Sequence, residues 1–250
     1  MKLCIIPPLN YLELANLGDA DFILAQRVLK YENYAEFYRK SKRWKIMDNG
    51  AYEQEALSMS ELLEAGRRVE ADVIVLPDEP YFPDQSYWLT YYALDELEEE
   101  DRREFMWMVV PHGRTVDEYL YYARKFLHLL PKWQIMGLSI LDLYKWNTRL
   151  RPFVIPAILE LQREYNFGIH LLGLDEPLEL YLYAQFQFTG HIDSVDTSLP
   201  ITWAYYDKSL HVLDDEVNWS RVPFNATLTD TQYQLAIHNI KVLKNLAEKV

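Results

Sequence analysis

Two aspartates stand three residues apart in the segment TGHIDSVDTSLP, residues 189–200, which otherwise has the pattern of a β-strand. Successive side chains of a strand point to opposite faces, so this odd spacing sends Asp193 and Asp196 to opposite faces. The two carboxylates therefore cannot share one proton as a neighbouring pair. We expect one of them to point inward or anchor a loop, and the other to end the strand.

Other residues that could do chemistry also follow short apolar runs directly. Those runs end in DNGAYE (48–53), PDEP (77–80), PHGR (111–114), GLS (137–139), LG (172–173) and DTS (196–198). The chain has only eight glycines, and Gly50, Gly113, Gly137 and Gly173 all lie at these ends, where they let a flat ligand or a neighbouring backbone approach closely. Each polar residue also has a structural alternative: Asp48 or Asp78 as a helix N-cap, Tyr52 in the core, and His112 as a structural histidine.

The elements that must position these residues alternate along the chain. Apolar strand-like runs cover 2–8, 21–25, 44–50, 71–78, 105–113, 133–139, 168–173 and 191–198, and helical patterns cover 58–69, 115–130, 152–165, 176–188 and 230–248. Alternating buried strands and helices predict a parallel sheet covered on both faces, and eight units in 250 residues predict a single-domain α/β (β/α)8 TIM barrel over 1–250. Residues 199–228 are expected to form a long loop before a closing helix. In such barrels the active site forms at the C-terminal ends of the strands.

Composition narrows the class of protein. The net charge of −13 argues against a protein that coats nucleic acid, although a local basic patch is still allowed. Cys4 is the only cysteine, so neither an internal disulfide nor a cysteine zinc cluster can form. No apolar run reaches about 18 residues, and MKLCIIPPLNYL predicts a first strand rather than a signal peptide. We therefore expect a cytoplasmic protein that does not span a membrane.

Five of these motifs, in this order, resemble the tRNA-guanine transglycosylase superfamily. DNGAYE (48–53) resembles the family's D-S-G-G-[FY]-Q, LPDEP (76–80) its F-D-E-C-x-P and MGLS (136–139) its G-G-L-A. The segment HLLGLDEPLELYLYAQFQFTGHIDSVDTSLP (170–200) repeats the family's turn, helix and last strand of the form G-I-D-x-x-D-x-x-L-P. The resemblance covers roughly residues 46–200 and implies a transglycosylase barrel.

The resemblance also assigns roles. It implies that Asp196 is the nucleophile, that Asp48 is the general acid/base, and that Asp193 is structural. It implies that Asp78 reads the guanine edge and that Tyr52 stacks on the base. The remaining base contacts it implies are Gly137 and Leu138, through backbone groups, Leu172 and Gly173 on the other side, and His112 near the place where the family has a glutamine.

Two departures from the family direct the choice of substrate. Cys4 is the only cysteine, so the zinc site of three cysteines and a histidine that tRNA-modifying members carry is absent here, and we expect no appended RNA-binding domain. Such reduced relatives resemble the DpdA-type phage and bacterial DNA-guanine transglycosylases, which insert 7-deazaguanines such as preQ0 into DNA. The resemblance therefore implies DNA and a 7-deazaguanine base as partners, with RNA as the alternative nucleic acid, and no metal or other cofactor.

The chemistry expected of such a site is like that of a retaining glycosidase. A carboxylate attacks C1′, guanine leaves from the other face with help from a general acid, and the incoming base then attacks the glycosyl-aspartate. The target nucleotide must be flipped out of any duplex. The basic run YRKSKRWK (38–45) precedes a strand and should lie at the opposite end of the barrel. The nucleic-acid contacts predicted on the correct side are Arg114, Lys145, Trp146, Arg149, Arg151 and Lys208.

Three other functions are compatible with the sequence. The same site could belong to an enzyme that only hydrolyses the N-glycosidic bond, or that acts on tRNA. A non-catalytic binding homologue is a second alternative, although it would need neither Asp48 nor Asp196. An unrelated metal-dependent barrel hydrolase is a third, since Asp48, Asp78, His112 and Asp196 are residue types that bind divalent ions. The sequence leaves the oligomeric state open.

Overall fold

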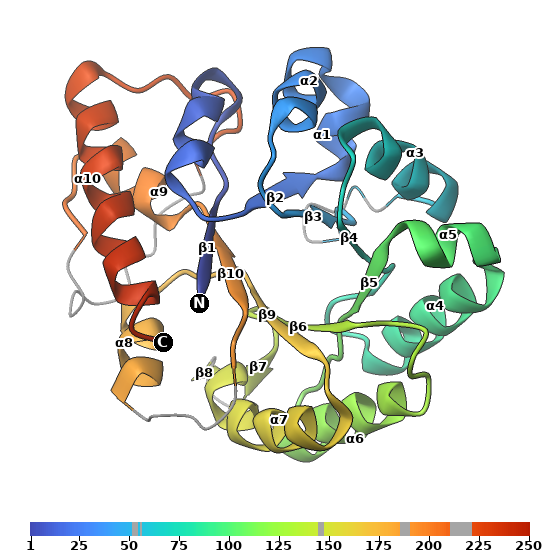
Figure 1. Ribbon diagram of the computed structural model, residues 1–250. Coiled ribbons are helices and arrows are strands. Elements are labelled where there is room, and N and C mark those ends of the chain that lie inside the picture. The colour runs from blue at the N-terminus through green and yellow to red at the C-terminus, as the bar shows by residue number, and fades with distance from the viewer. Residues whose placement is uncertain (52–54, 56, 145–147, 186–190, 211–221) are drawn as a thin grey trace.

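Eight parallel strands form a closed barrel in the computed structural model (Figure 1). The structure describes all residues except 52–54, 56, 145–147, 186–190 and 211–221. The strand order is β1-β10-β9-β6-β5-β4-β3-β2, and a parallel bridge between Cys4 and Ala20 brings β1 beside β2 to close the ring. This is the single-domain (β/α)8 TIM barrel that the alternating pattern predicts.

The strands are short and all lie where the sequence predicts them. They are β1 (Lys2–Ile5), β2 (Asp21–Leu24), β3 (Lys45–Asp48), β4 (Val73–Val75), β5 (Met106–Val109), β6 (Ile135–Ser139), β9 (Gly168–Leu172) and β10 (Ser194–Thr197). The helices around them are α1 (Ala25–Lys30), α2 (Glu32–Lys40), α3 (Met59–Val69), α4 (Pro83–Glu96), α5 (Glu99–Glu104), α6 (Val116–Leu127), α7 (Arg151–Tyr165), α8 (Pro177–Gln185), α9 (Leu199–Tyr205) and α10 (Asp230–Ala247).

Alternation along each strand divides the buried residues into two layers. One cluster fills the inside of the barrel, and Cys4, Phe22 and Met108 belong to it. The larger cluster lies between the strands and the surrounding helices, and Leu3 and Ile5 of β1 belong to it. Because strand side chains alternate, Asp196, which pairs in register with Cys4, points into the barrel rather than toward the helices.

Three segments differ from the expectation. A 3-10 segment, η1 (Leu9–Leu17), follows β1, and a small antiparallel hairpin, β7 (Leu143–Tyr144) and β8 (Thr148–Arg149), follows β6. The prediction of a continuous loop over 199–228 is wrong at its start, because α9 occupies 199–205 and packs on α10. Pro200 in its first turn favours a helix there, and Ile201 and Trp203 supply the buried face.

Candidate functional site

A cavity of about 530 Å³ opens at the C-terminal ends of the strands. Asp48 from the end of β3, Asp78 after β4 and Asp196 from β10 all line it. Arg149 and Asp175 contribute further charges to its wall. The residues predicted at separate strand ends therefore meet around one space, which is large enough for a small heterocyclic ligand.

Asp196 is held rigidly inside the barrel. Its Oδ1 accepts hydrogen bonds from His170 Nε2 at 3.0 Å and from the Gly173 backbone N–H at 2.8 Å. A carboxylate oxygen accepts, so His170 donates from Nε2, and Ser194 Oγ lies 2.7 Å from Nδ1 on the other side of the ring. Phe22 stacks on His170 with ring centroids 5.5 Å apart. These contacts fix the carboxylate plane and leave Oδ2 with no hydrogen bond from the part of the chain that the structure describes.

The two aspartates of the opening segment have separate tasks. Asp193 lies just before β10, at the opposite end of the strand from the cavity, and its Oδ2 accepts the Ile169 backbone N–H at 2.7 Å. Asp196 lies on the interior face and lines the cavity. The first aspartate therefore anchors the start of β10 against β9, and the second presents a carboxylate to the site.

Asp78 belongs to a buried chain of polar side chains. His112 Nε2 lies 2.6 Å from Asp78 Oδ2, and Asn49 Nδ2 donates to Asp78 Oδ1 at 2.6 Å. On its other side, His112 Nδ1 lies 3.0 Å from Asp142 Oδ2. The Gly113 backbone N–H also donates to Asp142, at 3.2 Å. One imidazole thus bridges two carboxylates that come from the loops after β4 and β6.

The charge state of His112 follows from those partners. Burial lowers the pKa of this imidazole, but Asp142 and Asp78 outweigh burial and together raise it to about 10. His112 is therefore an imidazolium at neutral pH, and it donates from both ring nitrogens. It does not line the cavity, so the predicted direct contact with a base is wrong; instead it supports Asp78, which does line the cavity.

Asp48 is half-buried at the end of β3 and lines the same cavity. Its Oδ2 accepts the Gly50 backbone N–H at 3.1 Å, which makes a tight turn directly after the strand. Gly50 has φ +80°, and a Cβ there would lie 2.8 Å from the Glu55 carbonyl oxygen, so this turn needs glycine. Tyr52, predicted to stack on a base, lies outside the described residues.

The backbone positions predicted for base contact are only partly placed at the cavity. Leu172 and Gly173 line it, whereas Gly137 and Leu138 do not. A Cβ on Gly137 would lie 2.7 Å from Leu172 Cδ1, so this glycine allows close packing between strands. The residues of this segment that line the cavity are Ser139, Ile140 and Leu141. The two predicted positions therefore come just before the lining residues in the sequence.

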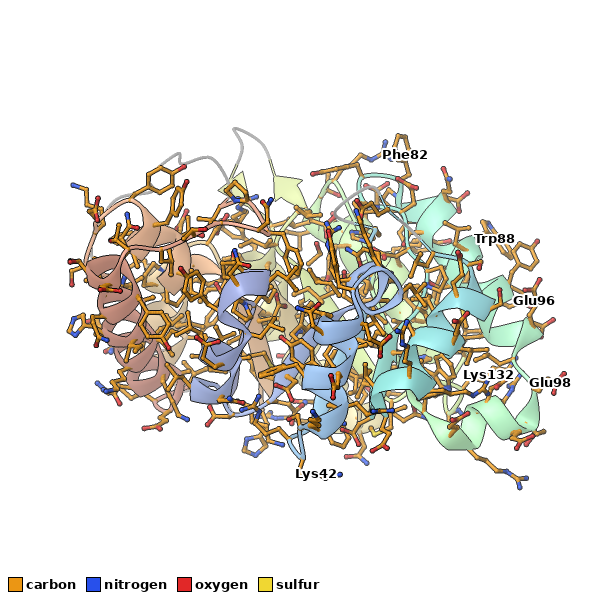
Figure 2. All side chains as sticks on the ribbon, turned by 90° about the horizontal axis from the view of Figure 1, so that it is seen from above. Lys42, Phe82, Trp88, Glu96, Glu98 and Lys132 are labelled. Atoms are coloured by element: carbon orange, nitrogen blue, oxygen red, sulfur yellow. The ribbon has the colours of Figure 1, made fainter. Side chains whose placement is uncertain are left out.

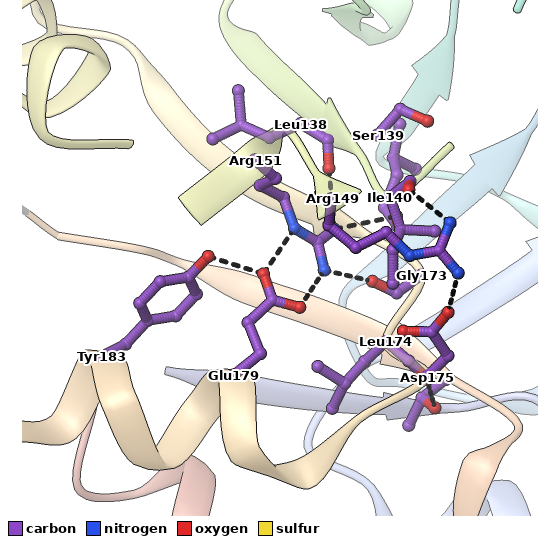
Figure 3. Close-up of polar contacts among 12 residues, drawn as sticks. Leu138, Ser139, Ile140, Arg149, Arg151, Gly173, Leu174, Asp175, Glu179 and Tyr183 are labelled. Carbon is purple, nitrogen blue, oxygen red and sulfur yellow. Dashed lines mark hydrogen bonds and ion pairs between the residues drawn. The ribbon is translucent and has the colours of Figure 1, made fainter. Parts of the chain in front are cut away.

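The prediction that Arg151 contacts nucleic acid is wrong, because this side chain is only 1% exposed. Its guanidinium donates to the carbonyl oxygens of Leu138, Leu172 and Gly173 at 2.8 to 3.0 Å. Nε and Nη2 also form two hydrogen bonds with Glu179, at 2.7 and 2.6 Å (Figure 3). Arg151 therefore ties β6, β9 and α8 together and has no donor to offer a phosphate.

Arg149 lies differently, as Figure 3 shows. It lines the cavity and is partly exposed, it donates to the Ile140 carbonyl oxygen at 3.1 Å, and it forms an ion pair with Asp175. Burial raises the pKa of Asp175 above its usual range even though Arg149 opposes that shift. Arg149 is the one cation among the described residues that line the cavity.

The remaining predicted nucleic-acid contacts are less central. Arg114 is exposed and forms an ion pair with Glu118 one helical turn away, and Lys208 is exposed after α9. Lys145 and Trp146 lie outside the described residues. Figure 2 shows Lys42, from the basic run 38–45, at the opposite end of the barrel from Phe82, which follows β4. The expected separation of that basic run from the mouth is confirmed.

Sequence reasoning missed three side chains that organise the site. Asn49 and Asp142 belong to the chain around Asp78, and His170 holds Asp196. A strand-by-strand reading offers one signal for His170, since it lies two residues before the end of β9 and so shares the interior face with Leu172. Asp142 gives no such signal, because it lies in a loop.

Taken together, the chain is a (β/α)8 barrel whose C-terminal mouth holds a cavity lined by carboxylates. Neither a protein-family model nor a curated protein matches it. Within the described part of the chain, no group of three or more His, Cys, Asp or Glu side chains is arranged to hold a metal ion. Among the same residues, no helix is both long and apolar enough to cross a membrane.

Proposed function

We propose that the protein is a guanine transglycosylase, a glycosyltransferase that exchanges guanine in DNA for a 7-deazaguanine base. The observation that carries the proposal is the convergence of Asp48, Asp78 and Asp196 on one cavity, with the two oxygens of Asp196 made unequal by their hydrogen bonds. These are the three carboxylates to which the resemblance assigns chemical roles. The fold is compatible with many enzymes, so the site carries the argument.

Asp196 suits the nucleophilic step. Its Oδ1 is held by His170 and Gly173, so the carboxylate cannot rotate freely, and Oδ2 is the oxygen we assign to attack on C1′ of the flipped nucleotide. The bond from C1′ to guanine N9 breaks as the bond to Oδ2 forms, and the electron pair of the broken bond leaves with the base. The product is a glycosyl-aspartate that the incoming base attacks in turn.

Asp48 and Asp78 would divide the remaining tasks. Asp48, half-buried beside a turn, would deliver a proton to the leaving guanine and take one from the incoming base. Asp78 already accepts one hydrogen bond on each oxygen, from Asn49 and from His112. A carboxylate has about four acceptor positions, so each oxygen can still accept one donor, and guanine presents two adjacent donors, N1–H and the 2-amino group.

The test is exchange of isotopically labelled guanine, or of preQ0, into guanine-containing DNA and, separately, into tRNA. Wild-type protein should incorporate label into DNA, Asp196→Asn should abolish incorporation, and Asp193→Asn should retain it. The last variant is a matched control because the same change is made three residues away, at the other end of β10. Asparagine can still accept the Ile169 N–H at that position.

Each other outcome points elsewhere. Label entering only tRNA would keep the chemistry and change the nucleic acid. Release of guanine without incorporation would indicate an N-glycosidase. Activity lost with a chelator would favour the metal-dependent hydrolase. Equal activity in wild type and Asp196→Asn would refute the assignment of the nucleophile.

A further inference from the structure

An unusual turn directly follows Asp78. The Phe82 backbone N–H donates to the Glu79 carbonyl oxygen at 3.2 Å, so Pro80 and Tyr81 occupy the two central positions. Tyr81 has φ +72°. Proline followed by a residue with positive φ is the arrangement of a type II turn, in which glycine or asparagine is the favoured second residue. A bulky aromatic residue in this conformation is strained, and such strain is concentrated at functional sites.

Packing does not explain the two aromatic rings of this turn. Tyr81 is 56% exposed and Phe82 is 59% exposed, so neither is a core residue. Tyr81 also lines the cavity, and Phe82 projects from the mouth end of the barrel in Figure 2. Two adjacent apolar rings are thus presented to solvent beside the carboxylate that we assign to base recognition.

Charge determines what such rings can contribute. The described residues that line the cavity include four carboxylates, on Asp48, Asp78, Asp175 and Asp196, against the single guanidinium of Arg149. The whole chain carries −13. With one guanidinium against four carboxylates among these lining residues, phosphate contacts at the mouth are opposed by its own charge. Stacking of bases on aromatic rings supplies affinity that is tolerant of sequence and does not depend on phosphate neutralisation.

We infer that Tyr81 and Phe82 form a stacking platform for unpaired nucleobases next to the exchanged nucleotide, so that the protein binds single-stranded nucleic acid largely through its bases. This inference rests on the proposed function for the identity of the ligand. It requires no covalent step. It also predicts that binding weakens only slightly with salt, unlike binding by a basic protein.

The experiment is equilibrium binding of a fluorescent thymidine oligonucleotide, which contains no guanine and therefore reports on the platform without the exchange reaction. Tyr81→Leu and Phe82→Leu should each weaken binding about tenfold, whereas Tyr81→Phe, which keeps the ring, should retain it. Tyr92→Leu is the matched control, because Tyr92 is 58% exposed but lies farther along α4. It should bind like wild type.

Tyr81→Gly adds a readout that a purely structural role would not produce. Glycine removes the strain at φ +72°, so this variant should unfold at a higher temperature than wild type and yet bind the oligonucleotide about tenfold more weakly. Opposite changes in stability and affinity would show that the aromatic ring serves binding.

The outcomes separate the platform from the proposed reaction. Label exchange with unchanged oligonucleotide affinity in both leucine variants would overturn the platform and leave the transglycosylase. Ring-dependent binding without exchange would keep the platform and overturn the enzyme assignment. Wild-type protein that does not bind the oligonucleotide would overturn the platform. The platform would also be overturned if Phe82→Leu left the oligonucleotide affinity unchanged but altered the sedimentation coefficient. That result would assign the rings to contact between copies of the chain.

Discussion

The imidazolium of His112 should make the stability of the fold depend on pH. An unfolded histidine has a pKa near 6.5, and the pair of carboxylates raises that of His112 to about 10 in the folded protein. Each unit of difference corresponds to about 1.4 kcal/mol, so the bound proton contributes roughly 5 kcal/mol to the free energy of unfolding. Because the folded pKa is the higher one, this contribution is complete below pH 6.5 and is lost as the pH rises toward 10.

The variant Asp142→Asn tests this reasoning. It removes one of the two carboxylates that raise the pKa of His112, at a residue that is only 3% exposed. Removing one partner of a buried ion pair costs about 3–5 kcal/mol, so the variant should be destabilised by that amount near pH 6. The difference from wild type should then shrink as the pH rises, because the wild-type protein loses its own stabilisation over the same range.

The assay is urea unfolding at several values between pH 6 and pH 9.5, with the free energy of unfolding extrapolated to water. Asp117→Asn is the control, since it makes the same change in an exposed carboxylate of α6. Other groups that titrate in this range affect wild type and variant alike and cancel in the difference; Cys4, whose pKa burial raises in the folded protein, is one that titrates here only in the unfolded chain. A difference between Asp142→Asn and wild type that stays constant with pH would refute the assignment of His112 as a buried imidazolium.

Two further variants test the framework around the site. Arg151→Lys should lower the free energy of unfolding by about 3 kcal/mol, because an ammonium cannot reproduce the forked contacts of the guanidinium. Chemical denaturation would measure this loss, and a loss below about 1 kcal/mol would contradict the structural role. Gly173→Ala should lower the free energy of unfolding by about 1–3 kcal/mol, since φ is +75° there and the new Cβ would lie 2.9 Å from Ile140 Cγ2. Thermal unfolding would measure this, and an unchanged melting temperature would contradict the predicted strain.

Much of the barrel could be predicted because its signal is local. Each strand is a short apolar run, and most are followed by a helix with a polar face, so the element order required no long-range information. The prediction failed in part of residues 199–228, where α9 forms. Its seven residues are too few to show a convincing helical period, and their burial depends on contact with α10, which is distant in sequence.

In the candidate site, too, the residues that could be predicted are those with a local signal in the sequence. Asp48, Asp78 and Asp196 could be predicted at one mouth because each ends or follows a strand, and parallel strands end at one rim. The local sequence gives no comparable signal that a charged side chain will be buried. Arg151 looked like a surface cation because it stands in a basic segment, yet Glu179, 28 residues later, compensates its charge inside the fold. The contact between His112 and Asp142 spans 30 residues and likewise depends on how two loops meet.

The position of β10 has a consequence for the synthesis of the protein. This strand lies between β9 and β1, and its register pairs Ser194 with Lys2 and Asp196 with Cys4. The carboxylate assigned to attack the substrate thus lies on the strand that joins the end of the ring to its beginning. On a ribosome, the first strand must wait for about 190 residues of nascent chain before its partner emerges. Until then the ring stays open, and a truncated chain that lacks this strand lacks Asp196 as well.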